Sequence, residues 1–181
     1  MKTSLLFAAV WAALLTSANA APLVAPQHPQ APQLVHPVLA NREADQIAKL
    51  LRATEAECAR QPEEYRVDCL RYGLWDIRTW VKQQKEYRGS FPPVVQELRA
   101  LERELKKIVD ANADPAAPRI PVRRKKLQAV KKAAVPKVNA AARARIAETQ
   151  TRLLRSSGAG TRAQVTKVAQ ALGSTKKILR S

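Results

Sequence analysis

The sequence is poor in the residues on which most enzyme sites and β-rich folds depend. Among its 181 residues are 5 Gly, 2 Cys, 2 His, 1 Met, 3 Trp, 3 Tyr and 2 Phe. So few glycines argue against glycine-rich phosphate loops and turn-dense β-sandwiches, and none of the motifs GxGxxG, GxxxxGK[ST], HExxH or GxSxG occurs. The apolar residues are mainly Ala, Leu and Val, which favours helices. We therefore expect an all-α fold.

Catalytic chemistry has few candidate residues. Both histidines, His28 and His36, lie among the prolines of residues 21–40. Proline fixes φ and removes backbone donors, so we expect this segment to be an extended spacer that cannot hold a histidine rigidly. The acids of residues 55–64 cluster around an expected helical turn, whereas carboxylate catalysis needs two acids across a cleft. We predict a protein that is not an enzyme and has no catalytic residues, no metal site and no cofactor.

Residues 1–20 have the pattern of a secretory signal peptide. Lys2 supplies the positive start, residues 5–15 form an apolar run, and Ala18 and Ala20 place small side chains before the expected cut. A membrane-spanning helix needs about 20 apolar residues, more than this run contains. We expect export to the periplasm or the extracellular space of a bacterium.

The two cysteines, Cys58 and Cys69, are predicted to form a disulfide, because export places them in an oxidising compartment. Their separation of 11 residues does not fit a CxxC redox motif, and two thiols without a nearby histidine cannot complete a zinc tetrahedron. Cys58 falls near the end of one predicted helix, and Cys69 lies about two turns into the next. The disulfide would therefore staple an antiparallel helical hairpin.

A third helix is predicted over residues 92–111. Its apolar positions follow the 4, 3, 4, 3 spacing of a heptad seam. They are Val94, Leu98, Leu101, Leu105 and Ile108. Two interpretations remain open: the seam packs on the first two helices in a small three-helix bundle, or it pairs with a partner helix in a homodimer or coiled-coil scaffold. All aromatic residues after the signal peptide lie between 65 and 91, so we expect the core within residues 41–111.

The remaining chain looks different in composition. Residues 112–122 contain three prolines and predict a second linker. Residues 123–181 are rich in Ala, Lys and Arg, with thin apolar stripes that begin at a short predicted helix over 127–134. Because these stripes contain few large side chains, we expect a basic C-terminal region that is helical but only partly ordered.

The charge distribution is the strongest indication of function. Residues 41–122 carry 15 basic and 14 acidic side chains, a net charge of +1. Residues 123–181 carry 16 basic side chains and one acid, Glu148, a net charge of +15. So many like charges repel one another unless a polyanion screens them. We predict that a polyanion is bound by Arg123, Arg124, Lys125, Lys126, Lys131, Lys132, Lys137, Arg143, Arg145, Arg152 and Arg155.

The predicted export narrows the choice of partner. Outside the cytoplasm the available polyanions include lipopolysaccharide, anionic lipid, cell-wall polymers and acidic proteins. We expect the basic region to bind one of these, while the helical module is free to bind a protein partner. Two alternatives stay open: a nucleic-acid-binding protein outside the cytoplasm, with affinity that is independent of sequence and falls steeply with salt, and a coiled-coil scaffold.

Overall fold

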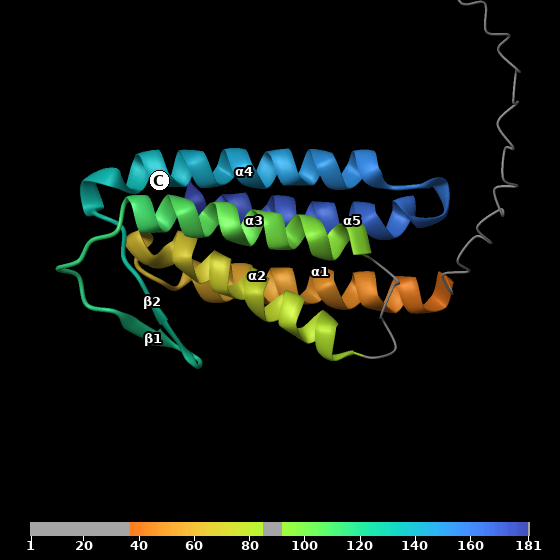
Figure 1. The fold of residues 1–181 in the computed structure, drawn as a ribbon, viewed down its shortest axis with the longest axis horizontal. Helices are drawn as coiled ribbons and strands as arrows, with labels where there is room; N and C mark the ends of the chain where they lie inside the picture. The colour runs from red at the N-terminus through yellow and green to blue at the C-terminus, as the bar shows by residue number, and fades with distance from the viewer. Residues whose placement is uncertain (1–36, 85–91, 181) are drawn as a thin grey trace, which may run out of the picture. The chain divides into compact units, whose positions relative to one another are not determined.

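The computed structural model describes residues 37–84 and 92–180 (Figure 1). The α-helices are α1 (Pro37–Ala59), α2 (Arg66–Gln83), α3 (Pro92–Ala111), α4 (Val135–Ser156) and α5 (Arg162–Ser174). The strands are β1 (Ile120–Val122) and β2 (Lys125–Leu127), and the short 3-10 helices are η1 (Glu63–Tyr65), η3 (Lys132–Ala134), η4 (Ala159–Thr161) and η5 (Thr175–Leu179). The all-α class is confirmed. The predicted signal peptide and both histidines lie outside the described residues.

The five helices lie alongside one another (Figure 1), and their packing closes a ring in which each helix packs on the next and α5 packs back on α1. Successive helices alternate in direction, so with five helices the closing pair, α1 and α5, is parallel. Hydrogen bonds near both ends of this pair show its direction. Gln164 Nε2 donates to Asn41 Oδ1 at 2.9 Å, and Ser174 Oγ donates to Glu55 Oε2 at 2.5 Å.

One hydrophobic core fills the ring, and both halves of the chain contribute to it. Residues up to 111 supply the large, fully buried side chains of Ile47, Leu51, Ile77, Leu98, Leu101 and Leu105. Residues from 127 onward supply those of Leu127, Ile146, Leu153, Leu172 and Leu179. The arrangement therefore differs from the expected three-helix module with a partly ordered basic region. The C-terminal stripes are thin, but their few large side chains all face the same core, and small alanines let the helices approach one another.

The disulfide between Cys58 and Cys69 is confirmed, with Cα atoms 5.6 Å apart. It joins the end of α1 to the first turns of α2, and both cysteines are buried. The two helices approach so closely here that a Cβ atom on Gly73 would collide with the Thr54 side chain. In the chain-entropy account, closing a loop of this length stabilises the folded protein by about 3 kcal/mol.

Helix α3 has the predicted bounds, but its neighbours differ from those expected. It packs on α2 and α4, whereas the sequence suggested packing on the first two helices. The side chains of Val94, Leu98, Leu101 and Leu105 are at most 1% exposed inside this single chain, and Ile108 is half-buried. The heptad seam is therefore occupied within the bundle.

No α-helix forms over residues 127–134, where the sequence predicted a short helix: β2 ends at Leu127, and Lys132–Ala134 form the 3-10 helix η3. A β-hairpin precedes this segment. Strands β1 and β2 pair antiparallel, with Val122 opposite Lys125, around a turn formed by Arg123 and Arg124. Arg123 adopts a φ of 52°, the left-handed conformation that two-residue hairpin turns require. The buried Leu127 that suggested a helical stripe is instead the inward residue at the end of a strand. Within residues 37–84 and 92–180, no helix is long and apolar enough to cross a membrane.

Candidate cationic surfaces

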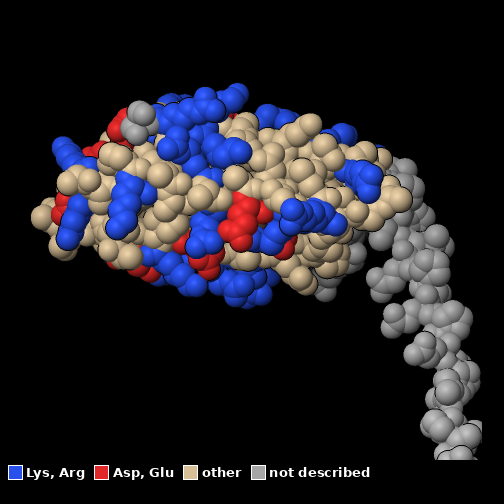
Figure 2. Space-filling view, turned by 90° about the horizontal axis from the view of Figure 1, so that it is seen from above, with Lys and Arg blue, Asp and Glu red and all other residues tan. Residues whose placement is uncertain are grey.

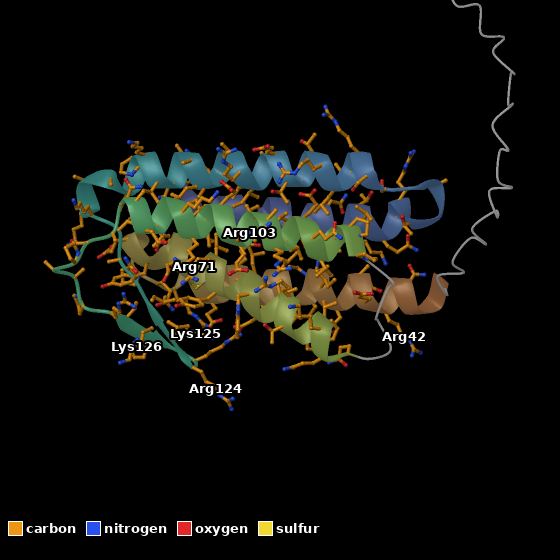
Figure 3. All side chains as sticks on the ribbon, in the orientation of Figure 1. Arg42, Arg71, Arg103, Arg124, Lys125 and Lys126 are labelled. Carbon is orange, nitrogen blue, oxygen red and sulfur yellow. A yellow bond between two sulfur atoms is a disulfide. The ribbon has the colours of Figure 1, made fainter. Side chains whose placement is uncertain are left out.

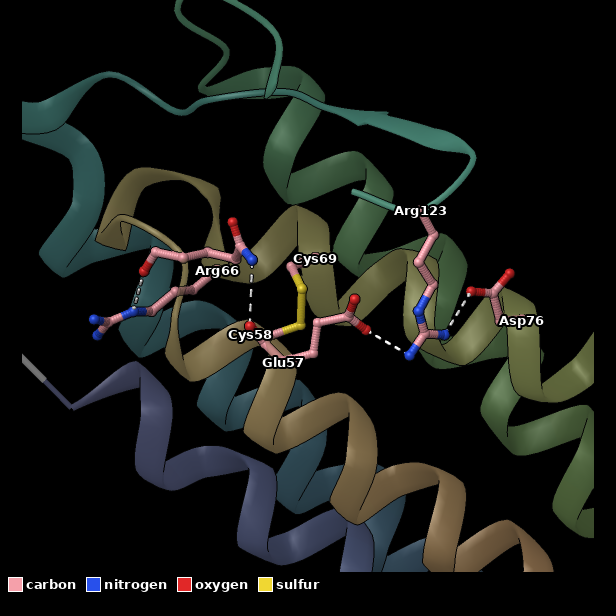
Figure 4. The surroundings of a disulfide bond; sticks show 7 residues. Glu57, Cys58, Arg66, Cys69, Asp76 and Arg123 are labelled. Carbon is pink, nitrogen blue, oxygen red and sulfur yellow. Dashed lines mark hydrogen bonds and ion pairs between the residues drawn. A yellow bond between two sulfur atoms is a disulfide. The ribbon is translucent and has the colours of Figure 1, made fainter. Parts of the chain in front are cut away.

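The hairpin lies against α1 and α2 beside the disulfide. At its turn, Arg123 Nη2 pairs with Glu57 of α1 at 2.7 Å, and Nη1 pairs with Asp76 of α2 at 3.6 Å (Figure 4). Next to the turn, Lys125 Nζ lies 3.5 Å from the ring centroid of Trp75 in α2, a cation–π contact. The inward side of the hairpin is thus fixed to both disulfide-linked helices.

The base of the hairpin is held by hydrogen bonds from the start of α2. The buried Asp68 carboxylate accepts the backbone N–H of Gln128 at 2.8 Å, and the Tyr65 hydroxyl donates to the Pro118 carbonyl at 2.5 Å. Burial, with a smaller effect from nearby carboxylates, raises the pKa of Tyr65, so its hydroxyl keeps the proton that it donates. Two residues close to Cys69 in sequence, Tyr65 and Asp68, therefore hold the chain just before β1 and just after β2.

The outward side of the hairpin carries unpaired positive charge. Along the strands, Val122 and Lys125 face the helices, whereas Lys126 is exposed. Arg124 at the turn is exposed and points away from the helices (Figure 3), and Arg119 is exposed before β1. We call Arg119, Arg124 and Lys126 the hairpin surface. In the described part of the chain none of the three has an ion-pair partner, and no acid occurs between Asp114 and Glu148.

A second positive region covers α4, α5 and η5. Residues 135–180 contain ten basic side chains and one acid. Three of the cations pair with Glu97, Glu148 or Asp45. The other seven have no ion pair among the described residues, and we call them the α4–α5 surface: Lys137, Arg143, Arg155, Arg162, Lys176, Lys177 and Arg180. Figure 2 views the molecule from the α4 side, where Lys and Arg side chains gather in several groups around a smaller acidic patch.

Helices α1 and α3 have nearly balanced charge, and α2 carries four basic and two acidic residues. Helix α1 contains three basic and four acidic residues, and α3 contains four of each. An ion pair also lies between α2 and α3, where Arg78 Nη2 is 3.2 Å from Oε2 of the buried Glu102. The net positive charge therefore lies mainly on residues after 122, although α1, α2 and α3 also carry exposed cations without an ion pair among the described residues.

The eleven residues predicted to bind a polyanion fall into two groups. Arg123 and Lys125 hold the hairpin in place, and Arg145 and Arg152 pair with acids on α3 and α4. A hydrogen bond to Glu97 raises the pKa of Arg152. The other seven have no ion pair among the described residues: Arg124, Lys126, Lys131, Lys132, Lys137, Arg143 and Arg155.

The structure does not bring these residues into one patch. The hairpin lies below α2 in Figure 1, whereas α4 runs along the other side of the bundle. The prediction also missed Arg119, which belongs to the hairpin surface. A strand over residues 119–122 would have predicted it, because Arg119 and Pro121 then lie on the outward side and Ile120 and Val122 on the inward side.

Glu43 in α1 is a buried titratable group outside both surfaces. Its side chain is 0% exposed, and neither carboxylate oxygen has a hydrogen-bond partner. Burial in this apolar setting disfavours the charged form and raises the pKa of Glu43 to about 7. This carboxylate therefore affects the pH dependence of stability.

The space beneath the hairpin is too small for an organic substrate. It measures about 20 Å³ and is bordered by Glu57, Cys69 and Arg123 among others, so it has room for about one water molecule. Among the residues that the structure describes, no group of three or more His, Cys, Asp or Glu side chains is placed to hold a metal ion.

Comparison with protein-family models, with curated proteins and with solved structures gives no match to this chain.

Proposed function

We propose that the protein is an exported, non-enzymatic helical protein that binds an anionic component of the bacterial envelope through its hairpin surface and its α4–α5 surface. The observation that carries this proposal is the set of ten cations on these surfaces that have no ion pair among the described residues. A buried disulfide supports an oxidising compartment, where such disulfides form and persist.

Phosphate-bearing lipids suit these surfaces best. Arginine presents a planar fork of donors that matches phosphate oxygens, and each Lys or Arg near an anionic membrane contributes about 1 kcal/mol of attraction. The aromatic residues in the described part of the chain are Tyr65, Tyr72, Trp75 and Trp80, and none belongs to either surface. Binding would therefore be peripheral and electrostatic, without an aromatic anchor in the bilayer.

The coiled-coil alternative has less support than the sequence suggested, because Val94, Leu98, Leu101 and Leu105 are buried within the bundle. Nucleic-acid binding keeps one favourable observation, since a two-stranded ribbon with an exposed Arg124 is of a size that the major groove admits. A duplex DNA shift assay at low and moderate salt addresses that alternative directly.

The test compares two variants of equal charge by co-sedimentation with vesicles of phosphatidylglycerol and phosphatidylcholine. The surface variant replaces six cations with Gln: Arg119, Arg124, Lys126, Lys137, Arg155 and Arg162. The control variant replaces six exposed cations on α1, α2 and α3 that have no ion pair among the described residues: Arg42, Lys49, Arg52, Lys82, Arg99 and Arg103.

We expect the surface variant to bind at least tenfold more weakly at about 0.15 M salt, and the control variant to lose less than threefold. Circular dichroism checks that both variants fold. Equal losses of vesicle affinity in the two variants would show that binding depends only on net charge, and would contradict the proposed surfaces. No binding by the unsubstituted protein would remove the proposal altogether.

A further inference from the structure

The hairpin surface and the α4–α5 surface face different directions. The hairpin spans the groove between α1 and α2, because Arg123 at its turn pairs with Glu57 of the first helix and Asp76 of the second. In the ring of five helices, the member opposite the α1–α2 pair is α4. Figure 1 shows the same relation, with the hairpin below α2 and α4 along the other side.

The thickness of the bundle makes α4 and the hairpin surface electrostatically independent. A helix with its side chains is about 10 Å across, so the α4 part of the α4–α5 surface lies roughly 20 Å from the hairpin surface, whereas α5 and η5 pack directly on α1. In physiological salt the Debye length is about 8 Å. Anions bound along α4 therefore leave the charge of the hairpin surface almost unscreened.

The shape of the α4–α5 surface matches an extended anionic plane. Helix α4 has 22 residues and is therefore about 33 Å long. Exposed Lys137 lies near its start and exposed Arg155 near its end. Cations spread over such a length can contact several lipid phosphates in one plane, but that plane cannot also reach the hairpin surface on the other side.

We propose that the protein binds two anionic lipid bilayers at once, one through each surface, and so holds them together. This inference rests on the proposed function, since it requires that each surface binds phosphate-bearing headgroups. A single flat bilayer neutralises one surface and leaves the other free to capture a second bilayer. The bundle would then set the gap between the bilayers at roughly 20–30 Å.

The experiment mixes the protein with vesicles of equal parts phosphatidylglycerol and phosphatidylcholine, and follows particle size by light scattering and bilayer spacing by electron cryomicroscopy. We expect vesicles to cluster at intermediate protein-to-lipid ratios, with a several-fold rise in mean size. A large excess of protein should disperse the clusters, because every bilayer is then coated and no free partner surface remains.

Three charge-matched variants separate the two surfaces. The hairpin variant (R119Q, R124Q, K126Q) and the α4–α5 variant (K137Q, R155Q, R162Q) should each still co-sediment with vesicles, yet lose at least fivefold of the clustering. The matched control (K49Q, R99Q, R103Q) lies on α1 and α3 and should cluster vesicles as the unsubstituted protein does.

The outcomes distinguish binding to one bilayer from bridging of two bilayers. Vesicle binding without clustering by the unsubstituted protein overturns the bridging inference and leaves the proposed function standing. Full clustering by both single-surface variants also overturns it, because self-association through another surface would then join the vesicles. Absence of vesicle binding removes the proposed function and the inference together.

Discussion

Helices α1 to α3 and helices α4 to α5 contribute to the same core but have very different surfaces. Leu105 in α3 and Leu153 in α4 are both 0% exposed, so neither half is peripheral to the fold. The first half has a nearly balanced charge, and its acids Asp45, Glu57 and Glu97 pair with cations of the second half, whereas residues 123–181 contain only one acid, Glu148. The change of net charge after residue 122 therefore changes the protein surface, but it does not mark a boundary of the hydrophobic core. The buried side chains of both halves form one core, whereas the two halves differ in their exposed charge.

The largest expected effect comes from removing the second half. Truncation after Val122 deletes five of the large, fully buried side chains of the shared core. We expect loss of cooperative unfolding and of most of the helical circular dichroism signal, because residues 37–122 cannot close the ring. If residues 41–122 retained a cooperative transition, the two halves would be separable and would not depend on one shared core.

A matched pair of substitutions sharpens the comparison within the intact chain. Leu105→Ala and Leu153→Ala remove the same atoms from positions with the same exposure, one in each half. Each should lower the free energy of unfolding by about 2–5 kcal/mol, measured by denaturant titration. A cost below about 1 kcal/mol for Leu153→Ala alone would show that α4 contributes little to the core.

Glu43 provides a smaller effect with a defined pH window. Its pKa is raised from 4.5 to about 7, so between these values the folded protein keeps a proton that the unfolded chain releases. Stability from this group is fully present below pH 4.5, and it is lost as the pH rises to about 7. At pH 8, Glu43→Gln should raise the free energy of unfolding by about 1–3 kcal/mol. The same gain at pH 4 would contradict this account.

The smallest effects should distinguish the two sides of the hairpin. Arg124→Gln and Lys126→Gln alter side chains without an ion pair among the described residues and should change stability by less than about 0.5 kcal/mol. Arg123→Gln removes partly exposed ion pairs to Glu57 and Asp76, and should cost up to about 1 kcal/mol. Thermal unfolding of the three variants measures this order, and a larger cost for Lys126→Gln would reverse the assignment of sides.

Much of the first half could be predicted from the sequence. The spacing of apolar residues predicted α3 with its observed bounds, and the two cysteines form the predicted disulfide. These signals are local, because helical periodicity and cysteine chemistry depend on nearby residues. The shared core could not be predicted, since Ile146 and Leu172 lie in apolar stripes with few large side chains, and nothing in those stripes shows that they face the same core as α1 to α3.

The candidate surfaces were only partly predictable for the same reason. Arg123 and Lys125 are indistinguishable from Arg124 and Lys126 in composition, yet the first pair faces helices and the second faces outward. The difference arises from the hairpin, which depends on the left-handed conformation of Arg123 and on partners more than 40 residues earlier.

The parallel pairing of α1 with α5 also dictates the order of assembly. A chain synthesised from its amino end exposes α1 first, but the helix that seals against α1 begins only at residue 162. Leu172 and Leu179, which complete the core, are synthesised only after α1 to α4. Contacts between such distant residues form slowly because a long loop must close first. The nascent chain therefore has no finished core until residues 162–179 have been synthesised.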